Sequence, residues 1–164
     1  KLKIVPVSIS YEYDPTDALK IPRLLAEAKN EVYKKEKNED FNTLISGIMG
    51  QKKHIHIHIG DLLTTELDFI GSQFETTNKQ IQALAQVLDA AIIGGYKLWS
   101  TNYIAYDILF NTDKYASHYT NHEKQLFMRR LERRIDESNA LAKKEFLTMY
   151  ANPVCNKEKY NELI

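Results

Sequence analysis

The feature that most constrains the fold is a strict alternation between Lys53 and Gly60, where three histidines and three isoleucines take turns. Successive side chains of a β-strand point to opposite faces, so this run predicts a strand with a histidine face and an isoleucine face. We expect the isoleucine face to be buried and the histidine face to be polar and partly exposed.

A second strand is predicted over Ile4–Ser10, because the run is rich in β-branched residues. We interpret it as a buried strand. Pro6 has no N–H to donate to a neighbouring strand, so we expect it at a sheet edge or at a bulge. About forty residues with helical patterns over 17–33 and 41–48 separate the two strands, and this spacing favours a β-α-β crossover in an α/β sheet.

The rest of the chain predicts helices. Apolar periodicity marks a helix over 77–93, and an aromatic-rich helix is expected over 99–110. A capping box at Thr120 opens a long charged helix, and a last helix is expected to end at about Tyr150, before Pro153.

We therefore divide the chain into an α/β part (residues 1–65) and a helical tail (residues 66–164) packed on it. The 164 residues allow a real core. Basic and acidic residues balance at 22 each, which argues against the strongly basic surface of a nucleic-acid binder. Cys155 is the only cysteine, so an intramolecular disulfide is excluded and a reducing compartment is favoured. No run approaches the ~18 consecutive apolar residues of a membrane span.

The segment IVPVSI at 4–9, an apolar strand with a central proline, resembles the fourth conserved block of the phospholipid and glycerol acyltransferases. Further stretches resemble a bacterial branch of that family with an extended C-terminal tail: IVPVSISYEYDP at 4–15, NEDF at 38–41, the run at 48–57, YKL at 96–98, NYIAYD at 102–107 and MYANP at 149–153. The resemblance implies the C-terminal part of an acyltransferase α/β fold, with few strands, followed by the helical tail.

In that family a fatty acyl group moves from a thioester, on coenzyme A or acyl carrier protein, to a glycerol-phosphate-type or other lipid acceptor. A histidine is the general base, and the aspartate of a His-x4-Asp motif orients its ring. That motif and the phosphate-binding blocks precede the proline strand, so we expect them upstream of Lys1 and expect this chain alone to be inactive, with no catalytic residue, metal or cofactor. The resemblance implies that Val5, Pro6 and Val7 shape the acceptor or acyl pocket.

Residues 12 and 13 follow the strand where α/β sheets tend to place ligands, so we hypothesise that Glu12 and Tyr13 line the pocket. The alternative is ordinary packing and a turn at the strand end. Two arginine pairs, at 129–130 and 133–134, lie four residues apart on one helix face. They either meet anionic headgroups or form a solvated face among the interleaved acids.

Three other patterns have a functional and a plain interpretation. His54, His56 and His58 share a strand face, as in His-x-His zinc sites, but no cysteine or carboxylate cluster completes the shell. His56 and Asp61 fit the His-x4-Asp spacing but come after the proline strand, in the wrong order. Aromatic residues over 96–106 form either a membrane-interface belt or packing contacts.

The leading hypothesis is thus an acyltransferase of phospholipid biosynthesis, peripheral at the inner face of the cytoplasmic membrane, with an acyl thioester and a lipid acceptor as partners and no nucleic acid. The alternative is a non-catalytic α/β-helical module that binds a protein or a membrane. A zinc-dependent hydrolase built on the histidine face is a third hypothesis.

Overall fold

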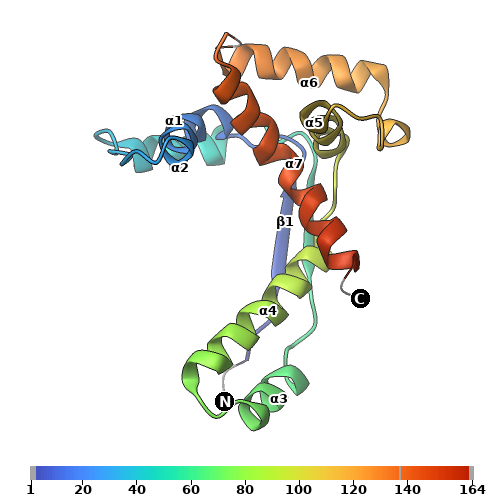
Figure 1. The fold of residues 1–164 in the computed structure, drawn as a ribbon. Coiled ribbons are helices and arrows are strands. Elements are labelled where there is room, and N and C mark those ends of the chain that lie inside the picture. Colours follow the sequence, from blue (N-terminus) through green and yellow to red (C-terminus); the bar gives the residue numbers. More distant parts are fainter. Residues whose placement is uncertain (1–2, 137, 163–164) are drawn as a thin grey trace. The chain divides into compact units, whose positions relative to one another are not determined.

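The computed structural model describes residues 3–136 and 138–162. The described chain is mostly helical and contains a small antiparallel sheet of two strands. In order along the chain (Figure 1) the elements are β1 (Val7–Tyr11), α1 (Asp17–Ala28), α2 (Glu39–Met49), β2 (Ile55–Ile59), α3 (Thr65–Gln73), α4 (Thr77–Gly95), α5 (Ser100–Phe110), a 3-10 turn (Ala116–His118), α6 (Asn121–Arg134) and α7 (Ala140–Glu162).

The chain forms two compact units, each assembled from segments that are distant in sequence. Unit 1 takes the residues up to 10, residues 55–97 and those from 156 onward. Unit 2 takes residues 11–54 and 98–155. The division expected at residue 65 followed chain order, whereas this one follows contacts, because β1 pairs with β2 and α7 contributes residues to both units.

The two strands run antiparallel, so the predicted β-α-β crossover is wrong. In unit 1 the N–H of Gly60 donates to the carbonyl of Pro6, and the N–H of Leu63 to the carbonyl of Ile4, both at 2.9 Å. Partner numbers rise on one strand as they fall on the other, which defines an antiparallel pair. A crossover needs helices packed on a parallel sheet, but α1 and α2 belong to unit 2. Pro6 has the edge position expected for it, since both described strands are edge strands.

The apolar face of this ribbon is exposed, contrary to the expectation of a buried isoleucine face and a buried first strand. We call it the ribbon face: Val5, Val7, Ile9, Ile55, Ile57 and Ile59, which are 46–70% exposed. Pro6 and Ser8, on the opposite face of β1, are buried. The alternation of residues determines which side chains share a face, but it does not determine which of the two faces is buried.

Helix α4 lies close to the histidine face of the ribbon, not to the isoleucine face. The end of α4 meets His58 so closely that a Cβ atom on Gly95 would lie 2.2 Å from the His58 Cδ2 atom. Any larger residue at 95 would displace the ring. Helices α3 and α4 pack against each other in the same unit. The helix predicted over 77–93 is confirmed and extends two residues further.

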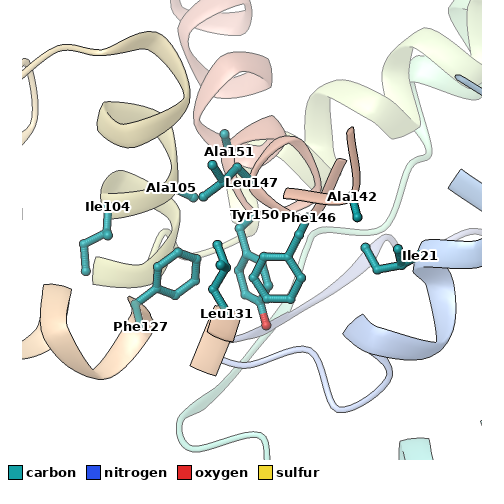
Figure 2. Close-up of a cluster of buried hydrophobic side chains, with 10 residues drawn as sticks. All are labelled: Ile21, Ile104, Ala105, Phe127, Leu131, Ala142, Phe146, Leu147, Tyr150 and Ala151. Carbon is teal, nitrogen blue, oxygen red and sulfur yellow. The ribbon is translucent and has the colours of Figure 1, made fainter. Parts of the chain in front are cut away.

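The core of unit 2 joins four helices (Figure 2). Its ten residues come from α1, α5, α6 and α7: Ile21, Ile104, Ala105, Phe127, Leu131, Ala142, Phe146, Leu147, Tyr150 and Ala151. The prediction that the last helix ends near Tyr150 is wrong, because α7 continues through Pro153 to Glu162. A proline inside a helix costs roughly 3 kcal/mol, and the burial of Tyr150, Ala151 and Val154 on either side of it offsets that cost.

Among the described helices, none combines the length and the apolar character that crossing a bilayer requires.

Candidate functional site

The pair Glu12 and Tyr13 opens unit 2, where main-chain pairing continues beyond β1. The N–H of Glu12 donates to the carbonyl of His54 and the N–H of Tyr13 to the carbonyl of Lys52, both at 3.0 Å. The Glu12 side chain is buried, and its carboxylate pairs with Lys53 and with the Nδ1 atom of His54. Glu12 is therefore a buried anchor for the segment before β2, and the hypothesis that Glu12 and Tyr13 line the acyl or acceptor pocket stays a prediction.

Lys53 is held in its charged form by this arrangement. Partial burial acts to lower the pKa of Lys53, but the hydrogen bond and the charge of Glu12 outweigh it and raise the pKa above its ordinary value. The ammonium also lies 5.4 Å from the centre of the Tyr13 ring. On the same ring, the Arg130 guanidinium lies 4.5 Å from the centre. Tyr13 thus contacts two cations.

Asp17 is the second anchor, and it fixes Arg130. The carboxylate is fully buried and accepts hydrogen bonds from the Nε atom of Arg130 at 2.7 Å and from the hydroxyl of Tyr150 at 2.9 Å. Arg130 also donates to the carbonyl of Asp14 at 2.8 Å. Burial, followed by the charge of Asp17, raises the pKa of Tyr150, so this hydroxyl stays a donor. Sequence analysis did not single out Asp17, because an aspartate at the start of a helix is typical of simple capping.

A pocket of about 520 Å³ opens beside these anchors, within unit 2. One wall comes from Tyr13, Gln51 and Lys53, and the other from Leu126 and the four arginines 129, 130, 133 and 134 of α6. The arginine pairs lie one helical turn apart, so all four side chains project to the same side of α6. Among the residues that the structure describes, the pocket wall contains five cationic residues and no carboxylate.

These cations differ in how far they are neutralised. Asp17 accepts a hydrogen bond from Arg130 and also lies 3.4 Å from the Nε atom of Arg134, which makes a looser ion pair. Within residues 3–136 and 138–162, Arg129 and Arg133 form no hydrogen bond or ion pair. Both are exposed at the pocket wall. The pocket therefore carries excess positive charge, which attracts an anion.

The other expected site residues lie elsewhere. Val5, Pro6 and Val7 belong to unit 1, where Val5 and Val7 are part of the exposed ribbon face and Pro6 is buried. The structure does not bring them together with Glu12 and Tyr13 in one unit. Unit 1 has an apolar groove of its own, of about 500 Å³, lined by residues of α3, of α4 and of the turn that joins them.

The remaining patterns have simple structural settings. No group of three or more histidine, cysteine or carboxylate side chains in the described ranges could hold a metal ion. His56 is half-buried and Asp61 is exposed. Of the aromatic residues, Trp99 stacks on His54 at 5.5 Å and Tyr103 stacks on His118 at 4.4 Å, both inside unit 2. These two rings thus have packing partners.

No protein-family model, curated protein or solved structure matches the chain.

Proposed function

We propose that the chain is the C-terminal part of an acyltransferase that moves a fatty acyl group from acyl-CoA or acyl carrier protein to a glycerol-phosphate-type or other lipid acceptor. The His-x4-Asp pair that activates the acceptor hydroxyl is supplied from upstream of Lys1. The enzyme works peripherally, at the inner face of the cytoplasmic membrane.

The observation that carries this proposal is the uncovered ribbon face. A two-stranded ribbon is marginally stable by itself, and an antiparallel sheet normally packs one face on a core. Here six β-branched aliphatic side chains on one face are about half exposed. Complete burial of such a side chain is worth roughly 1.5–3 kcal/mol, so each forgoes roughly 1 kcal/mol while it stays in water. An apolar patch of this kind marks an interaction surface.

An upstream acyltransferase domain is the cover that fits both the patch and the sequence resemblance. The ribbon face contains Val5 and Val7, which flank the proline of the block that resembles the family. In the proposed enzyme these side chains pack against the upstream domain and border the acyl or acceptor pocket. The alternating isoleucines of β2 then occupy the buried position that their sequence pattern indicates.

The test is an acyl-transfer assay on the protein from the complete reading frame that contains this chain. Product from acyl-CoA and glycerol 3-phosphate or lysophosphatidic acid is measured by mass spectrometry. We expect product from the complete protein and none from the 164-residue chain alone. A complete protein that acylates no acceptor with either donor, or product formed by this chain alone, overturns the proposal.

A matched pair of variants links the activity to the ribbon face. Ile57→Lys places a charge on that face and should lower activity at least tenfold, because a buried lysine is costly in a sheet interior. Val32→Lys adds the same charge at a side chain that is 88% exposed and lies outside the ribbon, so it should leave activity unchanged. Equal activity of the two variants contradicts the role assigned to the face.

The second candidate is a non-catalytic module that binds a protein or a membrane. The same ribbon face favours it, because an apolar sheet face can dock on a partner as readily as on another part of its own chain. This candidate predicts that the complete protein has no transferase activity and that Ile57→Lys abolishes partner or vesicle binding.

A further inference from the structure

The pocket between Tyr13 and α6 holds more positive charge than its own acids neutralise. Within the described part of the chain, two carboxylates form ion pairs with cations of its wall: Glu12 with Lys53, and Asp17 with Arg130 and Arg134. Glu123 acts on Lys53 from a distance and is itself engaged in the capping box with Thr120. None of these acids lines the pocket. The charge that remains is on the outward guanidinium groups of α6.

One of the four guanidinium groups, that of Arg130, is positioned before any ligand arrives. Arg130 is fixed by a buried carboxylate, a main-chain carbonyl and the face of Tyr13. Arg133 and Arg134 lie in the last turn of α6, where the helix dipole favours cations. A ligand that enters the pocket therefore meets one donor, Arg130, that the fold has already ordered, while the exposed side chains of Arg129 and Arg133 become ordered when they bind it.

Guanidinium groups in such an array suit one chemical class of ligand. The planar fork of arginine donates two parallel hydrogen bonds to a phosphate or a carboxylate. A phosphate offers three or more acceptor oxygens at one centre, so it can engage arginines from two successive helical turns together. A pocket of about 520 Å³ falls in the size range of sites for small organic ligands.

We propose that this pocket is a binding site for the phosphate or diphosphate group of an organic ligand, with Arg129 and Arg133 as its principal contacts. Arg130 and Lys53 add to the positive electrostatic potential of the pocket, and the ring of Tyr13 forms a flat part of the pocket wall. The inference does not depend on acyl transfer. If the proposed function also holds, the ligand is the phosphate-bearing end of the donor or of the acceptor.

The experiment measures binding to the purified protein by calorimetry at low ionic strength. Pyrophosphate and coenzyme A are the soluble probes, and vesicles of phosphatidylcholine with or without phosphatidic acid are the lipid probes. We expect saturable binding of at least one phosphate probe, weakened by added salt as ion pairing requires. Binding of coenzyme A identifies a soluble ligand, whereas binding only of the phosphatidic acid vesicles identifies a headgroup.

The decisive variant is Arg129→Gln combined with Arg133→Gln. Both side chains are exposed, so the fold should be retained, and this is checked by the fluorescence of Trp99. We expect affinity to fall at least tenfold, equivalent to about 1.4 kcal/mol. Arg23→Gln is the control, because Arg23 is an exposed arginine of the same unit that pairs with Glu27 and does not line the pocket.

Two results overturn the inference: no saturable binding of any of the three phosphate probes, or binding that the double variant leaves unchanged. Neither result bears on acyl transfer, which is measured separately on the complete protein. Conversely, suppose that the complete protein has no transferase activity but still binds coenzyme A through Arg129 and Arg133. The phosphate site is then supported, and only the proposed acyltransferase function is refuted.

Discussion

Replacing the buried carboxylate that fixes Arg130 is the sharpest test of how unit 2 is held together. Asp17→Ala removes the acceptor for Arg130 at 2.7 Å and for the hydroxyl of Tyr150 at 2.9 Å. The Arg130 side chain is only 9% exposed, so water cannot replace the lost partner. Breaking a buried ion pair by removing one member costs about 3–5 kcal/mol, since the other charge stays buried without compensation.

Urea unfolding followed by tryptophan fluorescence measures this loss in the relevant unit. Trp99 is the only tryptophan of the chain, and it lies in unit 2. With a denaturant dependence of about 2 kcal/mol per molar urea, the midpoint should fall by roughly 1.5–2.5 M. Glu27→Ala, on the same helix, breaks an exposed i,i+4 pair and should cost no more than about 0.5 kcal/mol.

A free energy of unfolding of Asp17→Ala within about 1 kcal/mol of the wild-type value would contradict this role of the buried carboxylate. If Asp17→Ala does not fold, the double variant Asp17→Ala with Arg130→Met is measured in its place. A buried pair replaced by apolar residues is often neutral for stability, so the double variant should recover most of the loss. No recovery would show that Asp17 acts through something other than the arginine.

Burial and the hydrogen bond to Asp107 raise the pKa of Tyr119 to about 12. The folded state therefore keeps this proton to a higher pH than the unfolded state, so the stabilisation is fully present below pH 10 and declines as the pH rises toward 12. Urea unfolding at pH 9 and pH 11 measures the decline in the free energy of unfolding, and Tyr119→Phe should reduce it. Equal declines in the variant and the wild type would contradict the assignment. Thr120→Ala removes the capping box of α6 and should cost about 1 kcal/mol, measured in the same way, whereas Thr120→Ser should keep most of it. Ile104→Ala should lower the free energy of unfolding by about 2–5 kcal/mol and Ile57→Ala by less than about 1 kcal/mol, because Ile104 is fully buried and Ile57 is exposed. A larger loss for Ile57→Ala would contradict the exposure of the ribbon face.

Local patterns predicted the elements well, because their causes are local. The capping box at Thr120 is confirmed, with the N–H of Glu123 donating to the threonine hydroxyl at 3.2 Å and the Glu123 carboxylate accepting from the N–H of Thr120. The helix over 77–93 was predicted from its apolar periodicity and the helix over 99–110 from its aromatic-rich run, and both are confirmed. The capping box and these helix patterns depend on residues a few positions apart.

Long-range partners were not predictable in the same way. The alternating pattern assigned the isoleucines of β2 to one face but could not predict that this face would be exposed to solvent. Asp17 reads as an ordinary helix start, and only the fold brings it to Arg130, which is 113 residues away. The arginine pairs were recognised as one helix face, yet the pocket needed Tyr13 and Lys53 from a distant segment to close it. The acyltransferase assignment stays a prediction.

The sharing of α7 between the two units has a consequence for synthesis. Residues of α7 up to 155 complete the core of unit 2, and the side chain of Lys157 donates to the carbonyls of Gly94 and Tyr96 in unit 1. Unit 2 cannot complete its core until this helix has left the ribosome. The nascent chain must therefore carry the helices of unit 2 with their apolar surfaces uncovered until α7 emerges, and such intermediates attract chaperones.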